Sequence, residues 1–292
     1  MGNLKDRPQL MWLVVGGSGQ LGKALSQVLT ERKIDFTSLN SNELDIQSFD
    51  ECKDSISRLR PEVVINAAAW TDVDLAESEE ESAYKVNAIG PLNLAKASKS
   101  IGAIFAQVST DYVFSGSSET PYEVDSMLGP ISAYGRTKAA GEKFVLTEYP
   151  EASYIFRTAW LYSKWGKNFA RTISNLAQVS EDEVRVVTDQ QGQPTSAIDL
   201  ANQIVDAISL RIPFGIYHAT NSGCATWFDF ATEIFHILGE STDRLAPVSS
   251  AEFKRIAERP KNSVLSHKCW NKNSIPTMRD WRIALKDSLA EF

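Results

Sequence analysis

Tyr134 and Lys138 are the two side chains of this 292-residue sequence whose types and spacing suit proton transfer. They stand at positions i and i+4 of a stretch that we predict to be helical, so both project from one face, about one turn apart. At a separation of about 4 Å and an effective dielectric of about 20, an ammonium stabilises a phenolate by about 4 kcal/mol. This predicts a lowered tyrosine pKa and a group able to act as acid or base near neutrality.

Thr110 and Asp111 supply polar groups that such a proton donor needs nearby. They follow an apolar run, Ile104–Ser109, that we predict to be a strand, and open α/β sheets bind ligands just outside the carboxyl ends of their strands. A hydroxyl there can hydrogen-bond a substrate carbonyl beside Tyr134. Composition alone yields about one Tyr–Lys pair at this spacing in such a chain, and Thr and Asp are also common as caps and turn residues. The prediction of a reaction site therefore depends on the agreement of these residues with a cofactor motif.

Three glycines, Gly16, Gly19 and Gly22, form a run in which each is three residues from the next. The run follows an apolar segment and opens an amphipathic one, which is the order in which a tight turn leads from a strand into a helix. Such a turn lets the backbone approach a pyrophosphate, whose charge meets the free N–H groups of the helix. The run predicts a dinucleotide site; an ordinary glycine-rich turn is the alternative interpretation.

The segment Leu39–Ile46 covers the position, about 20 residues beyond this turn, where dinucleotide folds carry the acidic residue that binds the ribose. No Asp or Glu stands directly at the predicted strand end, and no Lys or Arg is there to bind a 2′-phosphate. The residues themselves therefore leave NADH and NADPH open as cofactors. Asp45 either reaches the adenosine or caps a helix.

Short apolar runs alternate with amphipathic stretches through the first half of the chain. The runs that we predict as strands are Met11–Val15, Phe36–Leu39, Val63–Asn66, Ile104–Ser109 and Tyr154–Arg157. The helices predicted between them are Gln20–Arg32, Phe49–Leu59, Ser78–Ser100 and one that begins near Tyr134. This repeated β–α order predicts parallel strands with right-handed crossovers, and thus an α/β fold with a doubly wound parallel sheet of the Rossmann type.

After Trp160 the pattern becomes irregular, with several Pro and Gly breaks. Strands are predicted at Arg185–Val187 and Gly215–His218, and helices at Ile198–Ser209 and Trp227–Leu238. We expect residues 1–160 to form a dinucleotide-binding domain. Residues 161–292 are expected to form mainly a smaller C-terminal substrate lobe, with some segments returning to the first domain.

The composition argues against several classes of partner. A net charge of −7 would repel nucleic acids and anionic membranes, so neither is expected to bind. No apolar run is long enough for a signal sequence or a membrane span, and three scattered cysteines suit reduced thiols in the cytoplasm. The three histidines are too dispersed to form a metal site, and His218 is interpreted as a core histidine.

Three other features have simple interpretations. The acidic run Glu79–Glu81 is predicted to be a solvated helix start. Trp227, Phe228 and Phe230 are predicted to face the core. The segment Arg259–Lys261 is a candidate diphosphate clamp, and a surface turn is the equally acceptable alternative.

Longer motifs extend over nearly the whole chain. They are GGSGQLG at Gly16–Gly22, ELDI at Glu43–Ile46, VINAAAWTDVDLAE at Val63–Glu77, VSTDYVF at Val108–Phe114, PISAYGRTKAAGE at Pro130–Glu142, FRTAWLY at Phe156–Tyr162, GKNFA at Gly166–Ala170, DQQGQPT at Asp189–Thr195, GIYHAT at Gly215–Thr220 and WRIALK at Trp281–Lys286. Through them the sequence resembles the extended short-chain dehydrogenase/reductases, and among these the dTDP-4-dehydrorhamnose reductases. The STDYVF, RTAWLY and DQQGQPT stretches are more specific than the Tyr–Lys spacing.

The resemblance implies reduction of the C4 ketone of dTDP-4-dehydro-L-rhamnose by NADPH or NADH, with a dTDP-sugar as the partner and a homodimer as a compatible assembly. It implies that Tyr134 protonates the alkoxide and that Lys138 holds the nicotinamide ribose and lowers the Tyr134 pKa. Thr110 and Asp111 would contact the sugar and Trp160 would pack on it, the alternative for Trp160 being a core aromatic. The cofactor-binding residues that it implies are Gly16, Gly19, Gln20, Leu21, Gly22, Asp45, Ile46, Ala69, Trp70, Thr71, Tyr134 and Lys138.

The sequence departs from this family in two places. Asn and Ser stand at the end of the second predicted strand, where some members have an acidic residue. Some members also bind Mg²⁺ at a dimer interface through carboxylates whose counterparts cannot be placed here, so no catalytic metal is expected.

Two other functions stay open from the sequence. One is a non-catalytic regulatory subunit like the partner protein of a methionine adenosyltransferase, against which the intact set of Thr110, Tyr134 and Lys138 argues. The other is a reductase or epimerase of a different nucleotide sugar. An epimerase recycles its cofactor and would show no net consumption of NADPH or NADH.

Overall fold

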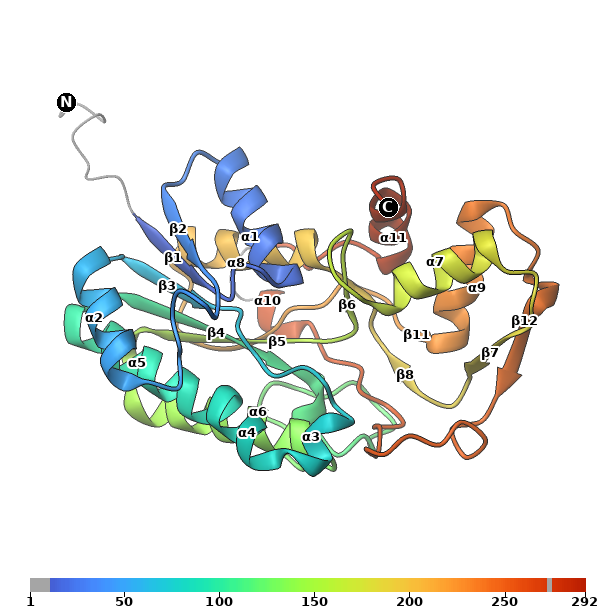
Figure 1. The fold of residues 1–292 in the computed structure, drawn as a ribbon, viewed down its shortest axis with the longest axis horizontal. Coiled ribbons are helices and arrows are strands. Elements are labelled where there is room, and N and C mark those ends of the chain that lie inside the picture. Colours follow the sequence, from blue (N-terminus) through green and yellow to red (C-terminus); the bar gives the residue numbers. More distant parts are fainter. Residues whose placement is uncertain (1–10, 272–274) are drawn as a thin grey trace.

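The computed structural model describes residues 11–271 and 275–292, and a parallel sheet forms its larger lobe (Figure 1). The sheet has six strands in the order β10-β5-β4-β3-β1-β2, and every neighbouring pair is parallel. In chain order the strands are β1 (Trp12–Val15), β2 (Phe36–Leu39), β3 (Val63–Asn66), β4 (Ile104–Thr110), β5 (Ser153–Thr158) and β10 (Gly215–His218). The order reverses at β1 and β3, because the chain runs outward from this pair in both directions.

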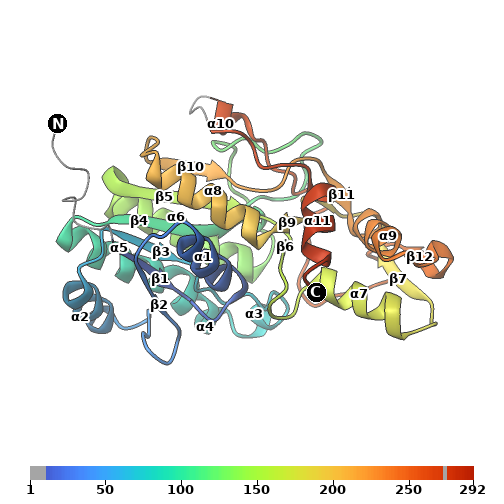
Figure 2. The ribbon, with the colours of Figure 1, turned by 90° about the horizontal axis from the view of Figure 1, so that it is seen from above.

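Helices cover both faces of the sheet, as Figure 2 shows from above. On one face lie α1 (Gln20–Glu31) and α8 (Ala197–Ser209), whose apolar side chains pack with those of β1 and β3. On the other lie α2 (Phe49–Leu59), α5 (Gly90–Ile101) and α6 (Ala133–Glu148). Strands buried on both faces need continuous apolar runs, and β1, β3 and β5 are buried at every position. The prediction of a doubly wound parallel sheet is confirmed.

The single helix predicted over Ser78–Ser100 is wrong, because the chain is helical there only in pieces. They are α3 (Leu75–Ser78), α4 (Glu80–Tyr84), the π-helical turn η1 (Lys85–Ile89) and α5. The wider π turn places the buried Asn87 toward the loop after β3. Its amide accepts a hydrogen bond from the N–H of Trp70 and donates to the carbonyl of Trp70 and to Thr137. The interruption therefore fixes this loop, a role that helix periodicity does not reveal.

The smaller lobe is built from later segments around its own apolar core (Figure 1). It contains α7 (Phe169–Val179), α9 (Trp227–Leu238), α11 (Trp281–Leu289) and the parallel pair of β7 (Val184–Val187) with β12 (Leu245–Val248). Two short pairs join it to the sheet lobe: β6 (Leu161–Tyr162) with β9 (Thr195–Ser196), and β8 (Gln191–Gly192) with β11 (Ala225–Thr226). The chain crosses between the lobes, since α8 and β10 lie in the sheet lobe.

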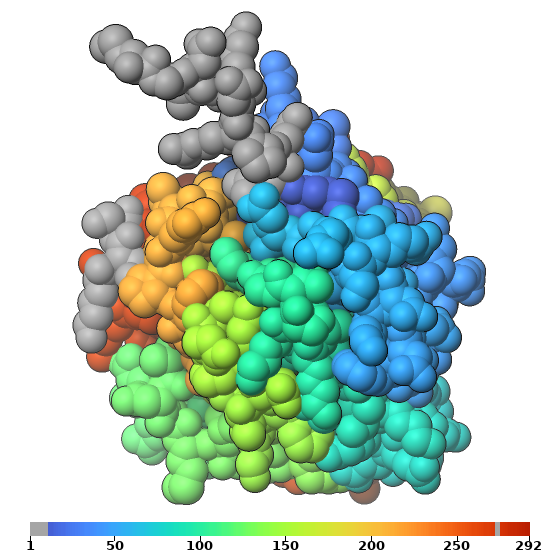
Figure 3. Space-filling view, turned by 90° about the vertical axis from the view of Figure 1, so that its left-hand side faces the viewer, coloured from blue at the N-terminus to red at the C-terminus, as the bar shows by residue number. Residues whose placement is uncertain are grey.

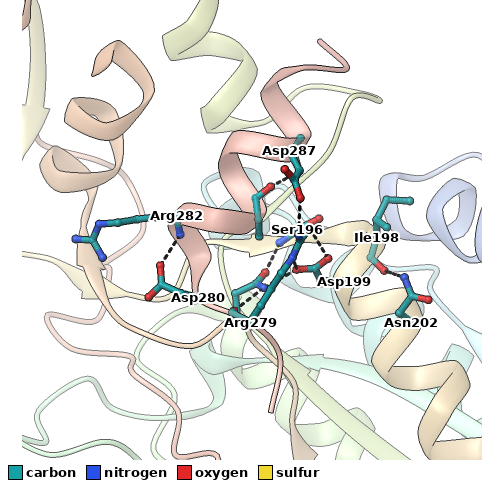
Figure 4. Close-up of polar contacts among 11 residues, drawn as sticks. Ser196, Ile198, Asp199, Asn202, Arg279, Asp280, Arg282 and Asp287 are labelled. Carbon is teal, nitrogen blue, oxygen red and sulfur yellow. Dashed lines mark hydrogen bonds and ion pairs between the residues drawn. The ribbon is translucent and has the colours of Figure 1, made fainter. Parts of the chain in front are cut away.

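Polar contacts attach the C-terminal helix α11 to α8 (Figure 4). The Arg279 guanidinium lies 2.8 Å from Asp199 in the first turn of α8 and 2.5 Å from Asp287 in α11. Asn221 donates to the Asp199 carboxylate at 2.7 Å and accepts from the N–H of Ser196 at 2.8 Å. Partly exposed ion pairs contribute little free energy of folding. We infer that this network fixes the orientation of α11 against α8 and adds little to the stability of the fold.

None of the described helices is both long and apolar enough to span a membrane. The three cysteines form no disulfide in the described part of the chain.

Candidate functional site

A cavity of about 350 Å³ lies at the carboxyl ends of the sheet strands. Its walls come from segments that follow β1, β3, β4 and β5 and from the start of α6. The lining residues that the sequence singled out are Gln20, Leu21, Ala69, Thr71, Thr110, Asp111, Tyr134, Lys138 and Trp160. Ligands of open α/β folds bind in this position. The fold therefore brings together residues separated by up to 140 positions in the chain.

The glycine turn lies at the entrance to α1. Gly16 has φ +87°, and a Cβ added to it would lie 2.5 Å from the backbone N of Ala68. At Gly22 an added Cβ would lie 2.2 Å from the carbonyl oxygen of Gly16. Gly19 precedes the first residue of α1, where no side chain caps the helix and no acidic residue occupies the first turn. A tight turn that leads into an uncapped helix N-terminus suits an anion such as a diphosphate.

Thr110 and Tyr134 meet across the cavity. Tyr134 lies in the first turn of α6, which begins after the cap Ser132, whose side chain accepts a hydrogen bond from the N–H of Gly135. A side-chain hydrogen bond joins Thr110 to the Tyr134 phenol. The Thr110 hydroxyl also donates to the Asp111 carboxylate at 2.9 Å. Thr110 in addition caps the short helix η2 (Asp111–Val113), which confirms the alternative interpretation of this residue as a cap.

Burial dominates the electrostatics of Tyr134. It raises the pKa of this phenol to about 12, with the hydrogen bond between Thr110 and the phenol lowering the pKa and the charge of Asp111 raising it. The expectation of a lowered Tyr134 pKa is therefore wrong for this structure, because burial dominates. The Lys138 ammonium donates to the carbonyl of Val108 at 2.7 Å, and its own burial lowers its pKa to about 8. A phenol with a high pKa stays protonated at neutral pH, which is the state that a proton donor needs.

A buried ion pair lies one turn beyond Lys138 on α6. Glu142 contacts the Arg157 guanidinium at 2.9 and 2.7 Å, and both side chains are 2% exposed. The charge of Glu142 raises the pKa of Lys138 against the effect of burial. His218 lies beside Arg157 and is completely buried, with its Nδ1 3.1 Å from the carbonyl of Ser266. The interpretation of His218 as a core histidine is confirmed.

Trp160 is part of the cavity wall. Its indole stacks on that of Trp227, with ring centroids 3.6 Å apart and planes 6° from parallel. The interpretation of Trp227 as a core residue is therefore incomplete, because it lines this cavity and a second one as well as packing on Phe169. Helix periodicity placed Trp227 correctly on the inner face of α9, but no signal in the sequence distinguishes a core from a cavity at that face.

The segment from Ser163 to Asn168 closes the cavity beside the glycine turn. The Ser163 hydroxyl and the Asn168 amide both donate to the side-chain oxygen of Gln20, each at 2.9 Å. Asn168 also caps α7. Lys167 lines the cavity, and its ammonium has no hydrogen bond or ion pair among the described residues. In the sequence, this segment was noticeable only through the resemblance to the reductase family. No local pattern predicts its contacts, because Gln20, to which both Ser163 and Asn168 donate, is more than 140 positions away.

Three of the cofactor-binding residues that the family resemblance implies, Trp70, Asp45 and Ile46, do not line this cavity. Trp70 is absent from the cavity lining; like Tyr134, it packs against a small cluster of buried alanines, and its indole N–H donates to the carbonyl of Asp72. Asp45 and Ile46 lie in the loop between β2 and α2, outside the lining, with Ile46 buried against Gly90. The glycines Gly16, Gly19 and Gly22 shape the turn, while Gln20 and Leu21 present its surface to the cavity.

Two buried hydroxyls in the wall are available to a ligand. Ser109 Oγ and Thr158 Oγ1 line the cavity and have no hydrogen-bond partner in the described part of the chain. Buried polar groups are nearly always hydrogen-bonded, and an orphan costs about 1–3 kcal/mol. The glycine turn and these two unpaired hydroxyls therefore suit a large polar ligand such as a dinucleotide.

A second cavity, of about 460 Å³, adjoins the first in the smaller lobe. The two share Tyr112 and Trp227 as lining residues. Apolar side chains of α7 and β7 form one wall, and Arg185, Arg255 and Arg259 supply positive charge. Arg259 contacts Asp74 at 2.8 and 2.9 Å, so its guanidinium is already paired with a carboxylate, and Lys261 is not in the lining. The candidate clamp therefore stays a prediction. Burial raises the Asp74 pKa, but the hydrogen bonds from Arg259 and Ala257 hold it below its ordinary value.

A third cavity lies at the opposite end of the sheet, on the face that Figure 3 shows. Its lining, which includes Arg60, Gly102, Ala152 and Arg211, belongs to the segments that lead into β3, β4, β5 and β10. It is thus separated from Tyr134 by the length of the strands. No group of three or more potential metal-binding His, Cys, Asp or Glu side chains occurs among the residues that the structure describes.

The chain is similar to known proteins over nearly its whole length. A model of the RmlD substrate binding domain family matches residues 10–292. A dTDP-4-dehydrorhamnose reductase of Streptomyces griseus is 44% identical over 285 residues, which are 96% of this chain and 93% of that protein. A dTDP-4-keto-6-deoxy-D-glucose reductase of Streptomyces niveus is 40% identical over 94% of each chain. The crystal structure of a dTDP-4-dehydrorhamnose reductase from Bacillus anthracis in complex with NADP superposes with a TM-score of 0.94 at 36% identity, covering 98% of this chain and 100% of that one.

Proposed function

The chain belongs to the RmlD substrate binding domain family, and from this premise we propose that it reduces the C4 ketone of dTDP-4-dehydro-L-rhamnose to dTDP-L-rhamnose with NADPH or NADH. One observation carries the proposal. The hydrogen-bonded Thr110 and Tyr134, with Lys138, line the same cavity as the surface of the glycine turn. A proton donor and a dinucleotide turn in one cavity are what a hydride-transfer reductase needs.

The cofactor fits the larger-lobe end of this cavity. The turn from Gly16 to Gly22, through Gln20 and Leu21, would hold the diphosphate, and the unpaired ammonium of Lys167 would approach it from the other side. The adenosine would extend toward Asp45 and Ile46, and the nicotinamide ribose toward Lys138. Ala69 and Thr71 would flank it, with Trp70 supporting that loop from behind. When bound, NADPH or NADH supplies the hydride.

The protein's own contribution to the reaction is the proton and its positioning. The Thr110 hydroxyl hydrogen-bonds the substrate carbonyl oxygen and orients it toward the Tyr134 phenol. As negative charge develops on that oxygen, Tyr134 transfers its phenolic proton to it. The resulting phenolate is stabilised by the Lys138 ammonium, whose charge the buried Glu142 supports. Before the sugar binds, the Thr110 hydroxyl donates its proton to Asp111 at 2.9 Å, and the hydroxyl turns to the substrate oxygen when the sugar is bound.

The second cavity suits the nucleoside diphosphate part of the substrate. Its apolar walls match a thymine ring, and the guanidinium of Arg255 matches a diphosphate, since guanidinium groups bind phosphate oxygens in pairs. Arg259, beside it, is already paired with Asp74. A ligand that fills both cavities passes Tyr112 and Trp227 and brings its sugar to Trp160 and Tyr134. The proposal includes a cytoplasmic location, a dTDP-sugar as the partner, no nucleic acid or membrane as a partner, and a homodimer as a compatible assembly.

Purified protein, a panel of dTDP- and UDP-linked keto sugars and either cofactor test the proposal. We expect stoichiometric oxidation of NADPH or NADH with dTDP-4-dehydro-L-rhamnose, and a product whose mass is greater by two hydrogens. Turnover without net cofactor oxidation would indicate an epimerase. A chain that binds cofactor but turns over none of the sugars would support the regulatory-subunit alternative and overturn the proposal.

One relative favours a second candidate substrate. The Streptomyces niveus protein is named for dTDP-4-keto-6-deoxy-D-glucose, which differs from the first candidate in the configuration of the sugar. The same assay with both sugars decides between them through the ratio of their kcat/KM values.

A further inference from the structure

Residues 253–256 form an exposed loop in the wall of the second cavity, and we call this loop the flap. After β12 the chain runs back from the smaller lobe toward the sheet lobe, and the flap lies on this path (Figure 1). All four flap residues are exposed, whereas Ala257, directly after them, is 2% exposed. Phe253 and Arg255 line the cavity. The flap is therefore a part of the cavity wall that solvent reaches from outside.

Carboxylates anchor the chain on both sides of the flap. Before it, Asp189 accepts hydrogen bonds from the N–H and the hydroxyl of Ser250, at 3.0 and 2.8 Å. After it, Asp74 accepts from the N–H of Ala257 at 3.0 Å and from the Arg259 guanidinium at 2.8 and 2.9 Å. Asp74 lies between β3 and α3 and Asp189 between β7 and β8, so two separate segments hold the ends of the flap.

The flap itself is weakly held between these anchors. Lys254, Arg255 and Ile256 take part in no backbone hydrogen bond among the described residues. Arg255 forms no ion pair in the described part of the chain, and its guanidinium lies over the Phe253 ring, 4.8 Å from the centroid. Ile256 is 79% exposed. A segment with so few hydrogen bonds and buried contacts rearranges at a low cost in free energy. The flap can therefore move while its ends stay fixed.

The flap carries the groups that bind a nucleoside diphosphate. Arg255 offers a guanidinium without a carboxylate partner, and guanidinium groups bind phosphate oxygens in pairs. Phe253 offers an aromatic ring, and nucleobases stack on such rings. The apolar side chains of α7 and β7 complete the wall of the same cavity. A ligand in this cavity would therefore meet the flap and the wall of the smaller lobe together.

We propose that the flap closes over the nucleoside diphosphate of the substrate, and that Asp74 and Asp189 are positioning residues that fix its two ends. This inference rests on the proposed function. The negative diphosphate attracts the Arg255 guanidinium, and closure removes the nucleotide from water. Because both ends are anchored, the closed flap holds the nucleotide in one place, and this places the sugar beside Tyr134.

Limited proteolysis with trypsin measures closure without turnover, because Lys254 and Arg255 are exposed cleavage sites. We expect dTDP, at a concentration that calorimetry shows to be saturating, to slow cleavage in the flap by about tenfold or more, since a closed segment is cut only when it reopens. Cleavage after Lys33, in the exposed turn between α1 and β2, is the internal control and should not change. Unchanged flap cleavage with saturating dTDP would overturn the proposal.

Asp189→Asn tests an anchor, because it keeps the size of the side chain and removes the carboxylate that holds Ser250. Asp189 lines neither ligand cavity. We expect faster cleavage of the flap and a KM for the keto sugar that is about tenfold higher, with the Kd for NADPH within about twofold of wild type. Asp182→Asn is the matched control, because Asp182 also accepts from a serine hydroxyl, that of Ser180 at 3.0 Å, and lies outside both cavities.

Asp74→Asn, measured through flap cleavage, repeats the test at the other anchor if Asp189→Asn does not fold. Removal of either carboxylate should speed cleavage of the flap in the absence of dTDP. Faster cleavage of Asp189→Asn with an unchanged KM would show that the anchors are only structural. That result would overturn their positioning role, as would cleavage at the wild-type rate in the folded variant.

The proposed function and this inference fail in different ways. A chain whose flap dTDP protects from trypsin, but which reduces none of the keto sugars, overturns the function and retains the flap. A chain that reduces the sugar, but whose flap is cut equally fast with and without saturating dTDP, overturns the inference and retains the function.

Discussion

The ammonium group of Lys138 donates a hydrogen bond to the carbonyl oxygen of Val108, 2.7 Å away, across the gap between α6 and β4. The bond fixes a buried cation at the carboxyl edge of the sheet, one helical turn from the Tyr134 phenol. It also explains how the charge is tolerated, because a buried ammonium needs a hydrogen-bond partner.

Tyr134→Phe should lower kcat by at least about a hundredfold, because it removes the proton donor and keeps the ring. The Kd for NADPH, measured by equilibrium binding, should change little. Tyr112→Phe is the control, because it removes the hydroxyl of a neighbouring tyrosine in the same cavity. The rings of Tyr112 and Tyr134 pack edge-to-face, with their centroids 5.7 Å apart. Full turnover in Tyr134→Phe would remove this residue from the chemistry.

The rate should depend on the protonation of Lys138. Burial lowers the pKa of this ammonium to about 8, so its charge is lost as the pH rises through that value. We expect kcat/KM to fall on the alkaline side with an apparent pKa near 8, since this ratio reports groups of the free enzyme. Lys138→Arg should be slower at every pH but should lack this alkaline limb, because a guanidinium stays charged. An identical limb in that variant would assign it to another group.

The same shift makes a prediction about stability. The folded-state pKa of Lys138 lies below its ordinary value, so the unfolded chain binds more protons between about pH 8 and its ordinary value of 10.5. The contribution of Lys138 to the free energy of unfolding should therefore rise with pH across that window. Urea denaturation of wild type and Lys138→Met at several pH values measures this contribution as the difference between the two slopes.

Lys167→Gln should weaken NADPH binding by about tenfold, because it removes a charge that faces the proposed diphosphate position. The salt dependence of the Kd should also decrease, since exposed charges are screened. Lys164→Gln is the matched control, because the ammonium of Lys164 is paired with Glu291 at 2.7 Å. If the KM for the dTDP-sugar rises instead while NADPH binding is unchanged, Lys167 serves the substrate diphosphate.

Glu142→Gln should lower the free energy of unfolding by about 3–5 kcal/mol, because it leaves the Arg157 guanidinium buried without its partner. The double variant Glu142→Leu with Arg157→Met should recover much of this loss, since it removes both charges. Denaturant unfolding of the three proteins measures the effect. Equal stability of Glu142→Gln and wild type would show that water or Val124 satisfies Arg157 alone, because its Nη1 already donates to the Val124 carbonyl.

Local and periodic features of the sequence were sufficient to predict the sheet and part of the site. Parallel strands buried on both faces appear as continuous apolar runs, so β1, β3 and β5 were found almost to the residue. The glycine turn was predictable because its steric demand acts between near neighbours: Gly22 must lack a Cβ on account of Gly16. The i, i+4 spacing of Tyr134 and Lys138 was likewise a local property.

Only the tertiary structure decided what depends on burial and on contacts between distant segments. The high pKa of Tyr134 follows from its burial between packed segments, which no spacing rule reports. The Trp160–Trp227 stack, the hold of Ser163 and Asn168 on Gln20, and the second cavity each join segments from different parts of the chain. A sequence pattern records which face of an element is apolar, but the packing of the lobes determines whether that face meets a core or a ligand.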